Sequence, residues 1–375
     1  MNKAKIGIKK YIKSTDIFLL LSCIAVSIYS CILLYSLASN EKIDMTIFTK
    51  QMLFSVVGVV AAIVISKIDY EFMANLWKIH MPLALILTLL TFTPLGIQRA
   101  EYIDDRAWLQ IPFIGTIQPS EILKISFILT FSLHLSLVSK SINKLKTLIP
   151  VCIHGAIPVL LIHFQGDDGT AIIFALIFLF MLFKSGLSYK YIFSGLGAIA
   201  VIAPIFWFFI MSDHQKNRIL AVYSPQNSSK SILWQQYIGK IAIGSGGMSG
   251  KGLVSDSYQM VPEEHNDFIF SFLGESTGFI GTILLLALLI FICFRIIRTI
   301  NIAEDELGEN ICVGVFAMIF CQSIINIGMN LSLIPVIGIT LPLMSAGGTS
   351  VMITYVSIGL VLSVYNRARM NMFLE

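Results

Sequence analysis

An acidic segment of the sequence directly precedes a long apolar stretch, and its residue types suit proton transfer. The segment is Pro262–Asp267, and the apolar stretch begins at Phe268. Asp267 has two interpretations. A helix N-cap alone would explain an aspartate there, whereas a carboxylate at a membrane rim, beside His265 and Glu263, could accept a proton from a hydroxyl nucleophile.

A second acidic cluster, Gln165–Thr170, follows another apolar stretch and contains the adjacent carboxylates Asp167 and Asp168. Two neighbouring carboxylates could bind a cation or hydrogen-bond a sugar, and a tight polar turn between two helices explains them equally well. A divalent cation such as Mg²⁺ or Mn²⁺ could be shared by Asp167, Asp168 and Glu263. The residue types select no particular metal and do not require one.

A charge pair is expected within a membrane helix. Pro119 suits the first turn of a helix, and Glu121 and Lys124 are then three residues apart on one face. Intramembrane ionisable residues are functional by default, although a local ion pair that stabilises the helix would also explain them. The preceding Trp108 could contact a ligand or simply anchor the chain at the interface.

The polar segment 213–267 contains two further patterns. Helical spacing places four apolar residues on one stripe, which predicts a helix lying in the membrane interface: Trp234, Tyr237, Ile238 and Ile241. The glycine-rich run Gly244–Gly252 includes Lys251 but lacks the spacing of a nucleotide-binding P-loop. A loop that approaches a diphosphate and a plain glycine hinge both remain open.

Composition limits the class of protein to which these clusters belong. Of 375 residues, 56% are hydrophobic and 13% are charged, against about 25% charged in soluble domains. This excludes a soluble enzyme, a nucleic-acid binder and a disordered chain. The 6 cysteines lie in apolar runs without metal-site spacing, which is typical of small hydrophobic residues in a core or in lipid.

Charge-free stretches of about one bilayer thickness recur along the chain and predict an all-α polytopic membrane protein with about ten transmembrane helices. The fourth stretch must extend back through Glu121 and Lys124, and the last one is divided by Pro335, Gly338 and Pro342. The stretches are Ile17–Asn40, Gln51–Ser66, Ile79–Gln98, Ile125–Ser139, Thr147–Gly166, Gly169–Phe183, Tyr191–Ser212, Ser276–Phe294 and Asn310–Asn366, the last forming two helices.

Charge asymmetry predicts the orientation. If the N-terminus is cytoplasmic and the helices alternate, most of the 26 Lys and Arg residues face the cytoplasm, as the positive-inside rule requires. Both termini are then cytoplasmic, and residues 213–267 form one long extracytoplasmic loop between helices seven and eight. Connecting loops of this length are uncommon, so we expect function there. Residues 1–375 are predicted to form a single membrane domain, with part of the active site in that loop.

These blocks together resemble the SEDS family (shape, elongation, division and sporulation proteins) of the RodA/FtsW type, with choices more similar to RodA. The resemblance spans Arg106 to Gly359. It rests on Arg106–Trp108 with Gln118-Pro119-Ser120-Glu121 and Lys124, on Gln165–Thr170, on Ile243–Gly252, on Pro262–Phe270 with Gly274-Glu275, and on Asn326–Met329, Leu333–Val336, Leu341-Pro342 and Ser345–Ser350. Ala107, Gly166, Asp168 and Asn266 depart from the family pattern, and 213–231 matches it poorly.

The resemblance implies a peptidoglycan glycosyltransferase of the bacterial cytoplasmic membrane that polymerises lipid II at the outer leaflet. Asp267 would take the proton from the 4-hydroxyl of lipid II, and the donor sugar would transfer with inversion. Arg106, Lys124, Lys240 and Lys251 would balance the charge of the leaving diphosphate. Further substrate contacts would come from Trp108, Gln118, Ser120, Glu121, Gln165, Asp167, Glu263, His265 and Ser345.

The implied partners are membrane lipid, a class B penicillin-binding protein that acts as transpeptidase, and other proteins of the elongation or division complex. Two other classes of function stay open. A lipid II transporter would also have many helices, an intramembrane charge pair and broken helices, and a scaffold without catalysis would tolerate loss of its outer carboxylates. The clustering of acidic groups near the predicted outer rim, rather than at the midplane, favours the enzyme.

Overall fold

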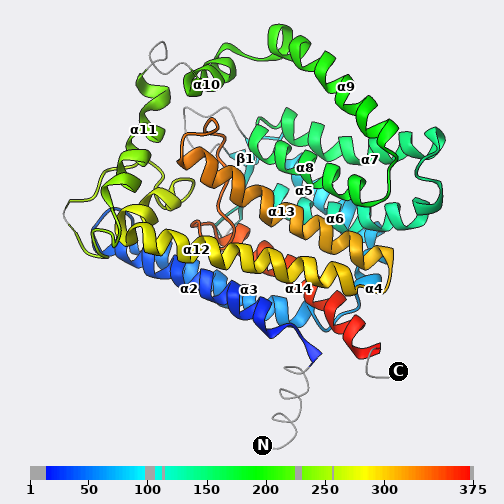
Figure 1. Ribbon diagram of the computed structural model, residues 1–375, viewed down its shortest axis with the longest axis horizontal. Coiled ribbons are helices and arrows are strands. Elements are labelled where there is room, and N and C mark those ends of the chain that lie inside the picture. The colour runs from blue at the N-terminus through cyan, green and yellow to red at the C-terminus, as the bar shows by residue number, and fades with distance from the viewer. Residues whose placement is uncertain (1–13, 98–105, 112–114, 224–229, 256, 372–375) are drawn as a thin grey trace, which may run out of the picture.

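A computed structural model describes residues 14–97, 106–111, 115–223, 230–255 and 257–371 of the chain (Figure 1). Its helices and strands, in chain order, are α2 (Ile17–Ser39), α3 (Met45–Ile65), α4 (Tyr70–Asn75), α5 (Trp77–Leu90), β1 (Gly96–Ile97), β2 (Trp108–Ile111), β3 (Gly115–Ile117), α6 (Pro119–Val138), η1 (Ser139–Ser141), α7 (Leu145–Phe164), α8 (Asp168–Lys184), α9 (Tyr189–Ile205), η2 (Phe206–Ile210), α10 (Asp213–Tyr223), α11 (Lys230–Ser245), α12 (Ile269–Ile302), α13 (Glu306–Asn330) and α14 (Gly348–Asn371).

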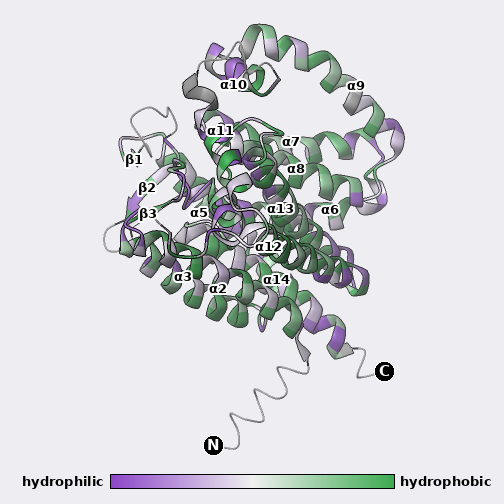
Figure 2. Ribbon diagram, turned by 60° about the vertical axis from the view of Figure 1, so that its left-hand side comes forward, coloured by the Kyte–Doolittle hydropathy of each residue, from purple (hydrophilic) through white to green (hydrophobic). Residues whose placement is uncertain are grey.

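The predicted all-α polytopic architecture is confirmed. Within the described ranges, 8 helices are long and apolar enough to cross a membrane. Two shorter helices, α5 with 14 residues and α8 with 17 residues, occupy the places of the other two predicted spans. The total of ten spans therefore stays a prediction. Many large apolar side chains of the helices are exposed, as expected of helices that contact lipid. Figure 2 shows the helices largely in green, the colour of hydrophobic residues.

Several predicted boundaries were wrong. The third stretch does not stay helical to Gln98, because α5 ends at Leu90 and the chain then enters a small antiparallel sheet of order β1-β2-β3. The eighth helix is much longer than predicted, with 34 residues in α12. The fourth helix does extend back to Pro119, which occupies its first turn. The last stretch is two helices, α13 and α14, separated by an irregular segment.

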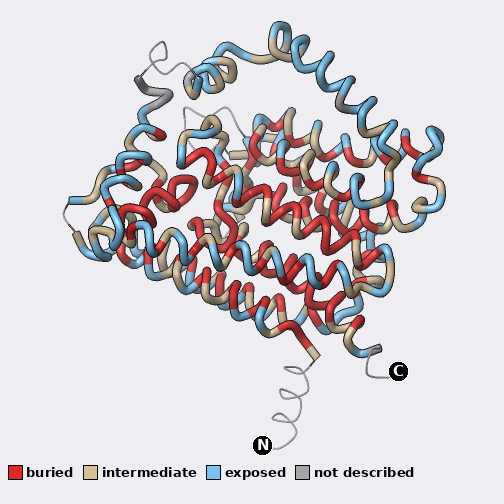
Figure 3. Tube along the Cα trace, viewed as in Figure 1, coloured by how far each residue is buried: buried red, intermediate tan, exposed pale blue. Residues whose placement is uncertain are grey.

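The core lies where α13 packs between α12 on one side and α6 and α8 on the other, while α14 packs closely along α3. Small residues allow the α3–α14 approach, because a side chain at Gly359 would come within 3.0 Å of the Ala62 backbone. Figure 3 shows this interior in red. None of the most apolar stretch of α9 is buried in the protein, and Figure 1 shows this helix standing apart from the bundle.

The glycine-rich run after α11 packs against a break in α12. Gly278 interrupts α12 with φ of 66° and ψ of −163°. The N–H groups of Lys251 and Gly252 donate to the carbonyls of Glu275 and Ser276 at 2.9 and 3.0 Å. This loop is therefore fixed to the first turns of α12 by backbone hydrogen bonds rather than acting as a free hinge.

Substitution of Gly246 tests this packing. A Cβ atom at Gly246 would lie 2.0 Å from the carbonyl oxygen of Gly274, whereas one at the neighbouring Gly244 would meet nothing within 4 Å. We expect Gly246→Ala to lower the free energy of unfolding by about 1–3 kcal/mol, as overpacking does. Thermal unfolding in detergent measures the change. Gly244→Ala is the matched control, and equal melting temperatures for the two variants would contradict the packing.

Candidate active site

A cavity of about 1050 Å³ opens among α3, α7, α8, α10 and α13 and the irregular segments before α12 and α14. Seven of the residues predicted to act in catalysis or binding line it together, although they are far apart in the sequence: Trp108, Gln118, Glu121, Asp167, Glu263, His265 and Asp267. The fold thus brings the two acidic clusters and Glu121 of the charge pair to one cavity.

Asp267 lies at the start of α12 with 8% of its surface exposed. The simple capping interpretation was wrong, because the N-cap of α12 is Phe268. Two amides of α13 hold the Asp267 backbone instead. Asn326 Nδ2 and Asn330 Nδ2 each donate to the Asp267 carbonyl at 2.9 Å. Asn330 Oδ1 also accepts from the Ser271 N–H at 3.1 Å, so it anchors the first turn of α12.

The residues just before Asp267 are held by the segment that precedes α14. Ser345 Oγ donates to the Asn266 carbonyl at 2.7 Å, and the Ala346 N–H donates to the His265 carbonyl at 2.8 Å. Asn266 Nδ2 donates to Glu263 Oε2 at 2.8 Å. Ser345 is therefore a buried support of the segment and does not line the cavity.

Asp167 supplies a second carboxylate to the cavity lining. Its Oδ1 accepts from the Thr170 N–H at 2.9 Å and so caps α8, while its Oδ2 accepts from Gln118 Nε2 at 2.7 Å. The polar turn between two helices is thus present, and the same carboxylate also borders the cavity. The pKa of Asp167 is raised overall. Desolvation is the largest cause and raises it, whereas the hydrogen bond with Thr170 and the positive charge of Lys124 lower it.

The predicted charge pair in α6 forms, with Lys124 Nζ 2.8 Å from Glu121 Oε1. Glu121 reaches the cavity wall, and Lys124, which is 1% exposed, lies behind it. The Lys124 ammonium therefore acts on the cavity through Glu121 and through its field at Asp167. Its burial next to a carboxylate explains how the helix carries both charges.

Five other predicted site residues lie outside the cavity lining: Arg106, Ser120, Gln165, Lys240 and Lys251. Ser120 and Gln165 are buried, and Gln165 Nε2 donates to Thr91 Oγ1. Lys240 is exposed on α11. Lys251 Nζ lies 2.5 Å from Glu275 Oε1, a carboxylate whose side chain is fully buried, so its charge is used to neutralise that group.

Two cationic residues that the sequence did not single out do line the cavity, Lys50 from α3 and Arg218 from α10. Lys50 directly precedes the apolar stretch Gln51–Ser66, and no motif distinguishes it from the other lysines. Arg218 lies in the stretch that matched the family pattern poorly. His163 of α7 also lines the site and pairs with Asp168 at 2.6 Å.

The geometry gives no support for a metal held by side chains alone. Among the residues that the structure describes, no group of three or more His, Cys, Asp or Glu side chains converges as ligands. Asp167 and Asp168 are instead engaged by Gln118 and His163. Carboxylate, hydroxyl and amide groups beside two cations suit a substrate that combines hydroxyls with a phosphate.

Asn330→Ala tests how Asp267 is held. The variant leaves the Asp267 carbonyl with one amide donor and removes the acceptor for Ser271. We expect the free energy of unfolding to fall by about 1–3 kcal/mol, the cost of an unsatisfied buried polar group. Thermal unfolding measures it. Ser323→Ala, which removes only a bond to the Ile319 carbonyl of the same helix, is the control, and an equal effect of both would count against the assignment.

Comparisons with known proteins agree with one another. The sequence profile of the FtsW/RodA/SpoVE family, described as "Cell cycle protein", matches residues 13–370. The peptidoglycan glycosyltransferase MrdB of Escherichia coli (strain K12) is 31% identical over 364 residues, which cover 95% of this chain and 94% of MrdB. The probable peptidoglycan glycosyltransferase FtsW of Geobacter metallireducens is 30% identical over 373 residues, covering 96% and 97%. The identities of 31% and 30% are too similar to assign the chain to the RodA type or to the FtsW type.

Two solved structures share the fold. A chain from a peptidoglycan synthase complex, studied for the structural coordination of polymerization and crosslinking, superposes with a TM-score of 0.80 at 23% identity. It covers 94% of this chain and 98% of that chain. The rod shape determining protein RodA of Thermus thermophilus superposes with a TM-score of 0.68 at 22% identity, covering 94% and 96%. The arrangement of the helices is therefore that of known membrane proteins.

Proposed function

The chain belongs to the FtsW/RodA/SpoVE family of cell cycle proteins, and from this premise we propose that it is a peptidoglycan glycosyltransferase that polymerises lipid II. The observation that carries the proposal is the cavity whose lining includes Asp267, a second carboxylate, Asp167, and two cations, Lys50 and Arg218. We place the cavity at the outer leaflet of the bacterial cytoplasmic membrane, with both termini cytoplasmic and the 213–267 segment outside.

In the proposed reaction, Asp267 is the general base. Its carboxylate takes the proton from the 4-hydroxyl of lipid II, and the freed oxygen attacks the anomeric carbon of the growing glycan. The bond from that carbon to the polyprenyl diphosphate breaks, and the leaving group keeps the electron pair. Attack from the opposite face turns an α-linked donor into a β-linked product. The diphosphate bond supplies the driving force, so the reaction uses no nucleotide.

The low exposure of Asp267, at 8%, suits this role because a base screened from bulk water interacts more strongly with a bound hydroxyl. Its two backbone hydrogen bonds from α13 fix the position from which the carboxylate acts. Positioning a base in this way contributes about 10²–10⁴-fold to a rate.

The leaving diphosphate needs positive charge where its own charge develops. We assign this role to Lys50 and Arg218, which reach the cavity from α3 and α10. Arg106, Lys240 and Lys251 lie outside its lining and are not part of this assignment. Glu121, which is paired with Lys124 behind it, and Asp167 with Gln118 line the same cavity and are suited to binding sugar hydroxyls.

We extend the proposal to assembly with a class B penicillin-binding protein, so that new glycan is crosslinked as it forms. The resemblance in sequence implies this partner, and a structural relative comes from a peptidoglycan synthase complex. Elongation or division proteins would join the same assembly, and residues 1–375 would act in it as a single membrane domain.

Asp267→Ala tests the proposed base. With purified protein and labelled lipid II, we expect glycan synthesis to fall by about 10²–10⁴-fold while the melting temperature stays close to that of the parent. Gel separation of the products measures the glycan ladder. Asp44→Asn, which changes an exposed carboxylate that caps α3, is the control with unchanged activity.

A full glycan ladder from Asp267→Ala would refute the base. If the protein instead moved lipid II across vesicle membranes without forming glycan, and did so equally well with Asp267→Ala, it would be a transporter. A purified protein that forms no glycan and moves no lipid II, with or without its cavity carboxylates, would leave only a scaffold.

Lys50→Ala and Arg218→Ala test the charge assignment. Each removes one cation from the cavity wall, and we expect each to lower kcat by about 10–10²-fold, because the lost interaction develops with the leaving group. The measurement is the initial rate of lipid II consumption. Lys140→Ala, at an exposed lysine in η1, should keep the parental rate, and a drop in all three alike would overturn the assignment.

A further inference from the structure

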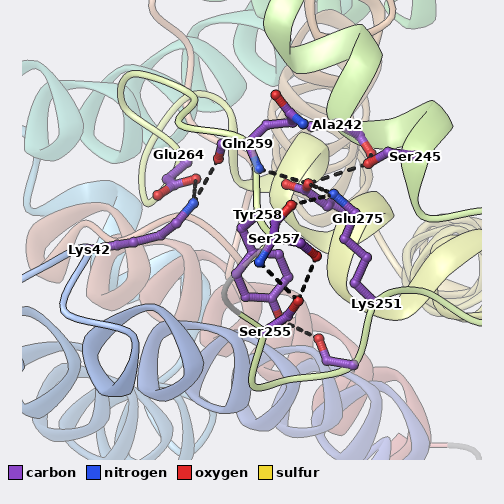
Figure 4. Close-up of polar contacts among 11 residues, drawn as sticks. Lys42, Ala242, Ser245, Lys251, Ser255, Ser257, Tyr258, Gln259, Glu264 and Glu275 are labelled. Atoms are coloured by element: carbon purple, nitrogen blue, oxygen red, sulfur yellow. Dashed lines mark hydrogen bonds and ion pairs between the residues drawn. The ribbon is translucent and has the colours of Figure 1, made fainter.

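A half-buried lysine outside the cavity connects the start of the bundle to the segment that carries Asp267. Lys42 lies in the connection between α2 and α3, and Figure 4 shows its ammonium group pointing toward Glu264 and Gln259. Lys42 Nζ donates to the Gln259 carbonyl at 2.7 Å and to Glu264 Oε2 at 3.1 Å. It also lies 5.2 Å from the centre of the Tyr258 ring. These three contacts all join the Lys42 ammonium group to the segment 258–264.

Glu264 is well placed to transmit a constraint to Asp267. Its side chain is 7% exposed, and a single turn joins it to the proposed base. Within that turn, the N–H groups of Asn266 and Phe268 donate to the Glu263 carbonyl at 3.0 and 3.1 Å. Glu264 itself does not line the cavity, so it acts on Asp267 through the turn.

A second ion pair supports the same segment from the other side. Glu275 Oε1 accepts from Lys251 Nζ at 2.5 Å and from the Gln259 N–H at 2.8 Å. The Gln259 peptide therefore lies between two ion pairs, with its carbonyl on Lys42 and its N–H on Glu275. This arrangement fixes the chain on both sides before it reaches Pro262.

We propose that Lys42 and Glu264 form a positioning pair for the glycosyl transfer step, which holds the turn before Asp267 in its productive place. The inference rests on the proposed role of Asp267. Neither residue touches the cavity, so both are positioning residues rather than catalytic ones. A misplacement of about 1 Å at a reacting group can cost about 10²-fold in rate. A pair that fixes the turn before Asp267 can therefore change the rate without touching the substrate.

The charge state of the pair changes near neutral pH. The pKa of Glu264 is raised to about 7. Burial is the largest cause and raises it, Lys42 lowers it by its charge and hydrogen bond, and the Glu275 carboxylate raises it. The charged or titratable groups around Glu264 are Lys42 from the α2–α3 connection, Tyr258 from its own segment, and Glu275 of α12, which Lys251 neutralises. Above this pKa Glu264 is ionised and paired, and below it the ion pair is lost.

Ionisation of Glu264 with rising pH is expected to change the free energy of unfolding and the catalytic rate in opposite directions. The folded protein holds the Glu264 proton more tightly than the unfolded chain does, so this group's contribution to the free energy of unfolding falls as pH rises from 4.5 to about 7. Activity should rise over the range in which the pair forms. A role limited to stability would give the reverse dependence, so the two roles can be separated by measurement.

The test compares Glu264→Gln, Lys42→Met, Lys42→Arg and the double variant Lys42→Met/Glu264→Gln, each in the full chain, by kcat for lipid II polymerisation between about pH 5.5 and 9. We expect Glu264→Gln and Lys42→Met to lower kcat at high pH by about tenfold, with KM changed by less than about twofold. Both should lose the rise in rate near pH 7. Lys42→Arg should restore most of the rate, and the double variant should be no slower than either single one.

The melting temperature of each variant is measured alongside its kcat. Glu264→Gln keeps the size of the side chain, so the fold should be retained. A Glu264→Gln protein with the parental kcat and the parental pH profile would overturn the inference. A loss of rate that only follows a loss of melting temperature, without rescue by Lys42→Arg, would also overturn it. Asp267→Asn and the parental chain are run in the same assay. If the parental chain forms no glycan, the proposed function fails, and if Asp267→Asn polymerises lipid II, the proposed base fails. If Asp267→Asn is silent and the pair variants are normal, only this inference fails.

Discussion

The hydrogen bonds from two α13 amides to the backbone of Asp267 are the interaction on which the site depends. A carboxylate at the end of an irregular segment would otherwise move with that segment. Asn326 and Asn330 each donate to the Asp267 carbonyl at 2.9 Å, and α13 is itself packed between α12, α6 and α8. The position of the proposed base is therefore set by α13, a largely buried helix of the bundle, and the Lys42–Glu264 contact adds a second constraint from outside the cavity.

The cavity shows how a membrane protein can hold several charges close together. Lys124 neutralises Glu121 within α6, Lys251 neutralises Glu275 at the break in α12, and Asp167 is held by Gln118 and a helix N-terminus. Each of these charges has a local partner, as the cost of isolated charges in a low-dielectric medium requires. Lys50 and Arg218 are at the cavity wall instead, where an anionic substrate can meet them.

Local patterns in the sequence predicted those parts of the structure that depend on neighbouring residues. The helical fold, the Pro119 start of α6, the Glu121–Lys124 pair and the division between α13 and α14 all follow from spacing over a few residues. The acidic clusters were also found, because carboxylates beside apolar stretches are rare.

The β1-β2-β3 sheet was missed, since its strands have only 2 to 4 residues and follow a helix that ends early. Contacts between distant segments gave no local signal: Lys42 and Glu264 are separated by 222 positions, and Lys251 was assigned to the substrate although its partner is Glu275.

The central claim is that the cavity brings the 4-hydroxyl of lipid II to the Asp267 carboxylate. The most direct measurement is a structure of the Asp267→Asn protein with lipid II bound and unreacted. We expect the 4-hydroxyl oxygen of the acceptor to lie within about 2.6–3.2 Å of the side-chain amide at position 267. The donor diphosphate should lie near Lys50 and Arg218. A bound acceptor whose 4-hydroxyl faces another carboxylate, or lies outside the cavity, would contradict it.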